Sequence, residues 1–170
     1  MNVLFHITAA VGVAVMLTDT DKIKPGNTLV QNSRTMLSVF AGGIISHGAI
    51  DYIPHCYPVN SKADIVCGFI LICTLLFLTR TGFRMITGLA IFGGILPDLI
   101  DLGPAMMNGI LNTNLPVFPK IFPWHWKVYS GSVYTGNCNV STFNHFLLLL
   151  MVAFICLLRK KDFLSIFRFN

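Results

Sequence analysis

Hydrophobic residues form five long runs along the chain, and the segments between them hold most of the polar residues. The runs are Val3–Leu17, Leu37–Ile53, Ala63–Thr79, Phe83–Ile100 and Thr142–Leu158. Each has about 15 to 18 residues, slightly fewer than the roughly 20 that a membrane-spanning helix usually needs. We predict one α-helix for each run.

The third run, Ala63–Thr79, helps to decide whether the predicted helices form a membrane bundle or a soluble one. Helices of soluble bundles keep a polar face, whereas this run is apolar nearly all round, with Asp64 near its start as its one charged residue. The whole chain is 54% hydrophobic and only 11% charged, against roughly 25% charged residues in an average soluble domain. We therefore predict an all-α fold, in which 1–170 form a single membrane-embedded domain of about five short transmembrane helices.

The basic residues predict how the bundle is oriented. Nine of the 12 Lys and Arg residues fall in the first connection, the third connection and the tail. Since basic flanks stay on the cytoplasmic side, we expect the N-terminus outside, the C-terminus inside and a long outer loop at 102–141. The tail at 159–170 mixes basic residues with Phe163, Ile166, Phe167 and Phe169, which predicts a segment lying on an anionic inner leaflet.

The same distribution argues against nucleic acid as a partner. The net charge of +5 is spread over loops and tail, without the single basic surface that nucleic-acid binding needs. The partners we expect are membrane lipids, a lipid-like substrate and a second copy of the chain in a homodimer.

With this topology, the histidines and several aspartates gather at the outer membrane boundary. All seven acids of the chain are Asp. Ionisable groups at membrane depth cost several kcal/mol and are rare unless they are paired, solvated or functional. The residues placed at this boundary are His6, His47, Asp51, His55, Asp98, Asp101, His125 and His145.

Spacing brings some of these residues together. His47 and Asp51 are four residues apart and so share one face of a helix, and Asp98 and Asp101 form a second close pair after Pro97. Either pair could instead cap a helix end. The block Gly42-Gly43-Ile44-Ile45-Ser46-His47 is similar to 93–98, Gly93-Gly94-Ile95-Leu96-Pro97-Asp98. Paired glycines about one turn before each polar residue predict that the two helices approach closely there.

A mixed set of imidazoles and carboxylates is typical of a hydrolytic metal site. We predict a divalent metal, with Zn²⁺ favoured over Mn²⁺ or Mg²⁺, and Asp51 and Asp101 as catalytic carboxylates. The predicted metal ligands are His6, His47, Asp51, Asp98, Asp101, His125 and His145. His6 and His145 could also be ordinary interfacial histidines, and His125 lies in an aromatic stretch, 123–127, that could simply anchor the loop at the interface.

The motifs Gly-x-x-Ser-His-x-x-x-Asp-x-x-Pro-His at 43–55 and Gly-Gly-x-Leu-Pro-Asp-x-x-Asp at 93–101 resemble the inner-membrane metal-dependent hydrolases, the YdjM-like group of small polytopic proteins. The resemblance implies a membrane α-bundle with a divalent metal in a bacterial inner membrane. It also implies a metal site at His6, His47, Asp51, Asp98 and Asp101. Downstream the chain departs from the family pattern, which tends to have two closely spaced histidines where this sequence has only His125.

Three functions remain open at this point. The first is a metal-dependent hydrolase that acts on a lipid-linked or amphiphilic ester or phosphoester at the outer boundary. The second is a cation or proton transporter that uses the same cluster, which would require ionisable residues deeper in the bilayer. The third is a non-catalytic structural protein. Separately, Cys56 and Cys138 fall on the same predicted side, where they could form a disulfide.

Overall fold

The computed structural model describes residues 1–23, 29–133 and 138–168. In these ranges all regular secondary structure is helical, which confirms the all-α prediction. The elements are α1 (Val3–Leu17), α2 (Leu29–Tyr52), α3 (Ser61–Leu78), η1 (Thr81–Phe83), α4 (Arg84–Asp101), α5 (Gly103–Leu111), η2 (Pro123–His125), α6 (Asn139–Leu158) and α7 (Lys160–Ile166). Each of the five apolar runs lies largely within one long helix, and α2 begins eight residues before its run does.

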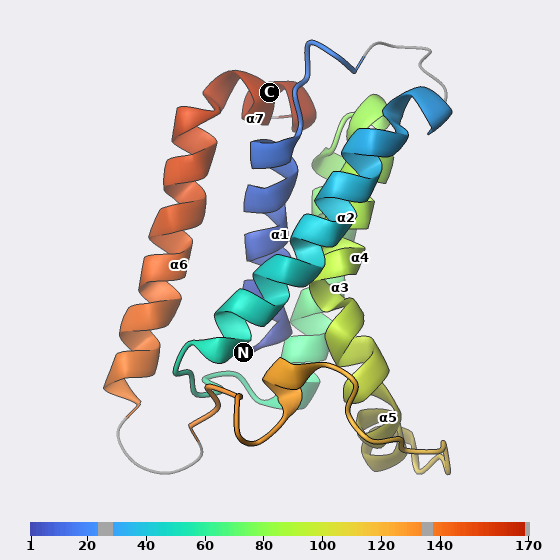
Figure 1. The fold of residues 1–170 in the computed structure, drawn as a ribbon, viewed down its shortest axis with the longest axis vertical. Coiled ribbons are helices and arrows are strands. Elements are labelled where there is room, and N and C mark those ends of the chain that lie inside the picture. The colour runs from blue at the N-terminus through green and yellow to red at the C-terminus, as the bar shows by residue number, and fades with distance from the viewer. Residues whose placement is uncertain (24–28, 134–137, 169–170) are drawn as a thin grey trace.

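The first helix, α1, lies in the middle of the bundle. It packs between α6 on one side and α2, α3 and α4 on the other (Figure 1). Small residues make this central position possible, because they let neighbouring helices come close. Those buried on α1 are Ala9, Ala10, Gly12 and Ala14.

Helices α2 and α4 cross at the paired glycines, as the sequence predicts. A Cβ atom added at Gly43 would lie 2.5 Å from the carbonyl oxygen of Ala90, and one added at Gly93 would overlap the carbonyl oxygen of Phe40. The two backbones therefore touch directly, one turn before the polar residues that they carry.

Replacing Gly93 with alanine should destabilise the bundle, because the new methyl group forces α2 and α4 apart. We expect a loss of about 1–3 kcal/mol, the range for overpacked cores, measured by thermal unfolding in detergent. Gly88→Ala is the matched control in the same helix. A Cβ atom at position 88 would lie 3.8 Å from the Leu76 side chain, an ordinary van der Waals distance, so this substitution should fit without strain. Equal melting temperatures for the two variants would contradict this picture of the crossing.

Three stretches in the described part of the chain are long and apolar enough to cross a membrane: Ser61–Leu78, Thr81–Asp101 and Asn139–Leu158. Helix α1 is apolar but has only 15 residues. The outward faces of α3 and α6 carry large exposed hydrophobic side chains, among them Phe69, Phe77, Phe146 and Leu157. Apolar faces of this size mark surfaces for membrane or protein contact.

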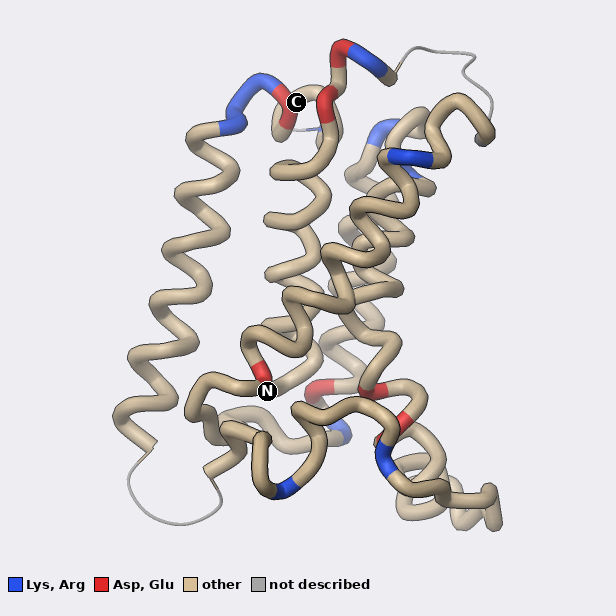
Figure 2. The backbone as a smooth tube through the Cα atoms, viewed as in Figure 1, with Lys and Arg blue, Asp and Glu red and all other residues tan. Residues whose placement is uncertain are grey.

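The two ends of the bundle differ in charge. Lys and Arg residues gather where α7 and the α1–α2 and α3–α4 connections meet, whereas acidic positions at the ends of α2 and α4 and at the start of α3 lie toward the opposite end (Figure 2). Lys24, one of the basic residues behind the orientation prediction, lies outside the described residues. The predicted tail therefore shares its end with the other basic segments.

The tail packs on the protein more closely than we predicted. Ile166 and Phe167 are fully buried rather than in contact with lipid. The cause is a backbone connection, because Arg80 N donates to Ile166 O at 2.9 Å and Arg168 N donates to Leu78 O at 2.7 Å. This part of the interfacial-tail prediction is corrected, and Phe169 lies outside the described residues.

Candidate metal centre

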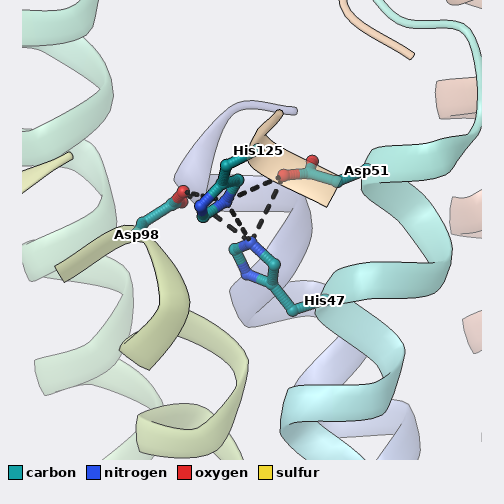
Figure 3. Close-up of side chains that lie close together, drawn as sticks. All are labelled: His47, Asp51, Asp98 and His125. Atoms are coloured by element: carbon teal, nitrogen blue, oxygen red, sulfur yellow. Dashed lines mark hydrogen bonds and ion pairs between the residues drawn. The ribbon is translucent and has the colours of Figure 1, made fainter. Parts of the chain in front are cut away.

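Four buried or nearly buried side chains converge at the acidic end of the bundle. His47 and Asp51 lie one turn apart on α2, Asp98 lies near the end of α4, and His125 belongs to η2 in the α5–α6 connection (Figure 3). Each offers one ligand atom, and these atoms all lie within 4.8 Å of one another. Three separate segments thus build one group of two imidazoles and two carboxylates.

The distances within the group fit a tetrahedral ion. His47 Nε2 lies 3.2 Å from His125 Nε2, 3.3 Å from Asp51 Oδ2 and 3.7 Å from Asp98 Oδ1. His125 Nε2 lies 3.4 Å from Asp51 Oδ2 and 3.3 Å from Asp98 Oδ1. Ligands at about 2.0–2.2 Å from a tetrahedral Zn²⁺ stand about 3.3–3.6 Å from each other. The five separations that involve an imidazole nitrogen, 3.2–3.7 Å, are therefore close to those around such an ion.

Hydrogen bonds aim both imidazoles at the centre of the group. His47 Nδ1 donates to the carbonyl oxygen of Gly94 at 2.7 Å, and His125 Nδ1 donates to Asp101 Oδ2 at 2.8 Å. A ring that donates through Nδ1 presents the lone pair of Nε2 to a metal. The Gly94 contact also links this group of side chains to the helix crossing.

Asp101 supports the group and does not join it. Its carboxylate accepts hydrogen bonds from Ile121 N at 2.8 Å, from Phe122 N at 2.9 Å and from His125 Nδ1. A carboxylate engaged in this way orients a histidine ligand from behind. The predictions of Asp101 as a ligand and as a catalytic carboxylate do not fit this arrangement, and we assign it the positioning of His125.

His6 stands at the edge of the group. Its ring stacks on that of His47 with centroids 3.8 Å apart, and its Nε2 lies 3.3 Å from Asp51 Oδ1 and 4.0 Å from Asp98 Oδ2. The side chain is fully buried, yet neither ring nitrogen makes a hydrogen bond within the described residues. Buried polar groups normally have a hydrogen-bond partner in proteins. The Nε2 atom of His6, which faces the carboxylates of Asp51 and Asp98, is therefore a further candidate ligand.

His145 lies away from the group, contrary to its prediction as a ligand. It projects from α6 onto the other side of α1, where its ring stacks on Phe5 with centroids 4.1 Å apart. Its Nδ1 lies 3.5 Å from Ser141 Oγ. His55 is closer, with Nε2 3.9 Å from Asp51 Oδ1, and burial lowers its pKa to about 4, so its ring is neutral at pH 7.

Two glycines that hold the His125 segment in place were not identified from the sequence. A Cβ at Gly48 would lie 2.7 Å from the Trp124 ring, so that ring packs directly on the α2 backbone. Gly131 N donates to Asp51 O at 2.8 Å, and Gly131 O accepts from His55 N at 2.9 Å. The one feature of the sequence that could have pointed to Gly48 is its position directly after the candidate ligand His47.

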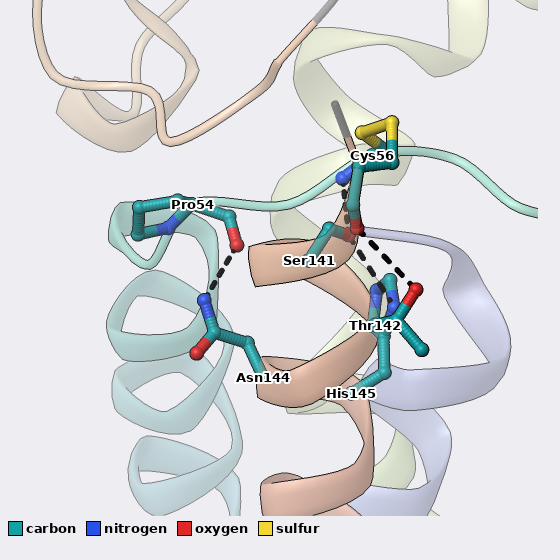
Figure 4. The surroundings of a disulfide bond; sticks show 7 residues. Pro54, Cys56, Ser141, Thr142, Asn144 and His145 are labelled. Carbon is teal, nitrogen blue, oxygen red and sulfur yellow. Dashed lines mark hydrogen bonds between the residues drawn. A yellow bond between two sulfur atoms is a disulfide. The ribbon is translucent and has the colours of Figure 1, made fainter. Parts of the chain in front are cut away.

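A disulfide joins the site's end of α2 to α6. Cys56 pairs with Cys138, the residue before α6, and Cys56 N donates to Ser141 Oγ at 2.6 Å (Figure 4). Asn144 Nδ2 donates to Pro54 O at 2.7 Å nearby. The pairing that the sequence left open is thus present, and it lies at the same end of the bundle as the metal group.

The protonation of His125 links metal binding to pH. Burial opposes its charge, but hydrogen bonds to the carboxylates of Asp51, Asp98 and Asp101 outweigh burial and raise its pKa to about 9. A metal must displace that proton from Nε2. Below pH 9 each unit of falling pH leaves roughly tenfold less of the ring deprotonated, so metal affinity should rise about tenfold per unit from pH 6.5 to 8.5.

Isothermal titration in buffers of different protonation enthalpy checks this prediction. We expect about one proton to leave His125 for each ion bound at pH 7. An affinity that stays flat over this range, with no proton released, would show that His125 is not a ligand.

We compared the chain with protein families, with curated proteins and with solved structures, and none of them matches it. The resemblance to the YdjM-like group therefore rests on its motifs alone.

Proposed function

We propose that this protein is a membrane-embedded, metal-dependent hydrolase with its site at the outer boundary of the membrane. The observation that carries the proposal is the group of His47, Asp51, Asp98 and His125, whose ligand atoms all lie within 4.8 Å of one another. Three of these residues, Asp51, Asp98 and His125, also line a cavity of about 740 Å³. A substrate can therefore reach the group through this cavity. A metal site with a purely structural role would not need such access.

The donor set favours zinc. Two imidazoles with two carboxylates suit Zn²⁺, whereas Mg²⁺ prefers oxygen ligands and octahedral geometry. Held by His47, Asp98 and His125, such an ion would keep its fourth position for a water, whose pKa it would lower to about 7, and it would polarise an ester or phosphoryl oxygen. Asp51 remains our predicted catalytic carboxylate, because its side chain reaches both the ligand group and the cavity.

Two independent features support the proposed orientation, with the N-terminus outside. Most basic residues lie at the end opposite the site (Figure 2), and basic segments stay in the cytoplasm. The Cys56–Cys138 disulfide lies at the end that holds the site, and disulfides persist in oxidising compartments. We propose five spans, α1, α2, α3, α4 and α6, in a bacterial inner membrane, in keeping with the motif resemblance.

A transporter is less well supported. A path for cations or protons would need ionisable side chains further along the bundle. The helix stretches Ile7–Leu17, Thr35–Ser46, Ile65–Leu78, Met85–Pro97 and Phe146–Leu158 contain no Asp, Glu, His, Lys or Arg. The ionisable groups are confined to the ends, as hydrolysis at one boundary requires.

An assay on the purified full chain tests the proposal. The protein is stripped of metal, reloaded with Zn²⁺ or Mn²⁺, and offered 4-nitrophenyl octanoate, 4-nitrophenyl phosphate and bis(4-nitrophenyl) phosphate. We expect turnover of at least one substrate that requires metal and that His47→Ala abolishes. Turnover that survives both metal removal and His47→Ala would refute the proposal, as would metal-loaded protein inert toward all three substrates.

A further inference from the structure

Two lysines line the cavity beside the candidate metal group, and neither of them belongs to that group. They are Lys120 and Lys127. Lys120 Nζ donates to the carbonyl oxygen of His125 at 2.9 Å, so its ammonium lies next to the ligand segment. Lys127 is exposed to solvent, and within the described residues it forms no ion pair.

The acidic residues around the cavity do not cancel these lysines. Asp51 and Asp98 balance the two charges of a divalent ion. The Asp64 carboxylate accepts from Val3 N at 2.8 Å and from Leu4 N at 3.3 Å, which places it at the positive N-terminal end of α1. With an ion bound, the two lysines leave the cavity with an excess of positive charge.

The cavity wall also carries hydroxyl groups and an apolar side. Tyr57 OH lies 2.9 Å from Ser132 Oγ, which lies 2.8 Å from Ser130 Oγ, and all three residues line the cavity. Hydroxyls of this kind can donate to the oxygens of an anion. Leu102 and Met106 line it as well, and they offer a surface for hydrocarbon.

We propose that the cavity binds the phosphate group of an amphiphilic phosphoester and that Lys127 selects this anionic substrate over a neutral carboxylic ester. The inference rests on the proposed hydrolase function and narrows its substrate class. A neutral ester has no charge for the lysines to recognise, whereas each phosphate oxygen can accept a charge-assisted hydrogen bond from an ammonium group. The apolar wall receives the hydrocarbon part of the substrate.

Hydrolysis of such a substrate requires only water. The water oxygen forms a new bond to phosphorus, and the bond between phosphorus and the alcohol oxygen breaks. One water proton passes to the departing alcohol oxygen, and the new oxygen stays on the phosphate with the other proton. No oxidant, reductant or other co-reactant enters the reaction.

Binding measurements on the zinc-loaded full chain in dodecyl maltoside test the inference. The probes are inorganic phosphate and dodecyl phosphate, titrated into wild type, Lys127→Ala, Lys127→Glu and Lys62→Ala. Lys62 is a matched control, since it is an exposed lysine at the same end that does not line the cavity. Metal content is measured on every sample, and we expect it to be equal in all four.

We expect dodecyl phosphate to bind wild type at least tenfold more tightly than inorganic phosphate does. Lys127→Ala should weaken dodecyl phosphate binding at least fivefold and Lys127→Glu at least twentyfold, while Lys62→Ala should stay within twofold of wild type. Equal affinity for the two probes would overturn the amphiphile assignment. Equal losses in Lys127→Ala and Lys62→Ala, or no loss in Lys127→Ala, would overturn the role of Lys127.

The design separates this inference from the function on which it rests. A wild-type chain that binds no metal refutes the proposed hydrolase. A chain that binds metal and hydrolyses a neutral ester, with phosphate binding insensitive to Lys127, refutes only the phosphate assignment.

Discussion

His47→Ala should abolish metal binding, reducing the metal content from about one ion per chain to less than a tenth. The substitution removes one of the four ligand atoms and leaves the carboxylates of Asp51 and Asp98 facing each other with one imidazole fewer. It also removes the hydrogen bond from His47 Nδ1 to Gly94 O, which ties α2 to α4 beside the site. Mass spectrometry of the purified protein after dialysis against trace Zn²⁺ measures the result.

His145→Ala is the control for this experiment. It also removes a buried histidine from the same end of the bundle, but from the far side of α1, where His145 stacks on Phe5. We expect it to keep a full complement of metal. If His47→Ala kept its metal, or if both variants lost it to the same extent, the ligand assignment would be wrong.

Asp101→Asn should weaken metal affinity about 10- to 100-fold without removing a ligand, as substitutions behind a ligand typically do. The amide has nearly the same shape but lacks the charge that holds His125 Nδ1 at 2.8 Å. Competition against a chromogenic chelator measures the change. Because Asp101 also helps to raise the pKa of His125, metal binding by the variant should depend on pH over a lower range.

Asp21→Asn makes the same chemical change at the opposite end of the bundle, where Asp21 pairs with Lys161. It should leave metal affinity unchanged. A loss of less than threefold in Asp101→Asn, equal to that of Asp21→Asn, would show that Asp101 does not position His125.

The long helices could be predicted because each of them contains a long apolar run. The predicted run Val3–Leu17 coincides with α1. The short helices α5 and α7 lie in segments that we predicted as loop and tail. A proline and two glycines fall within α5 and charged residues begin α7, so local composition does not distinguish a short helix there from an irregular connection. Which face of the tail is buried depends on the α3–α4 connection, a partner distant in sequence.

The convergence of His47, Asp51 and Asp98 from α2 and α4 could be predicted because helical spacing and paired glycines are local signals. Residues on the same face of one helix lie together whatever the rest of the fold does, as His47 and Asp51 do. The double glycines identified the crossing that brings Asp98 to them.

The roles of the remaining residues depend on direction, which spacing does not reveal. Neighbouring residues on a helix point about 100° apart, so Phe5 meets α6 while His6 meets His47. His145 shares its depth with the site but contacts the Phe5 face. Asp101 was predicted as a ligand for its position on α4, yet the fold of the distant loop places His125 in front of it.

The most direct test of the central claim is the X-ray absorption spectrum of the zinc-loaded protein at the zinc K edge. We expect about four nitrogen and oxygen ligands at about 2.0–2.1 Å, multiple scattering from two imidazole rings, and no sulfur near about 2.3 Å. With His6 as a further ligand, the spectrum would show three imidazole rings at the same site. A shell containing sulfur, or one of oxygen atoms alone with no imidazole signal, would contradict a metal centre at His47, Asp51, Asp98 and His125.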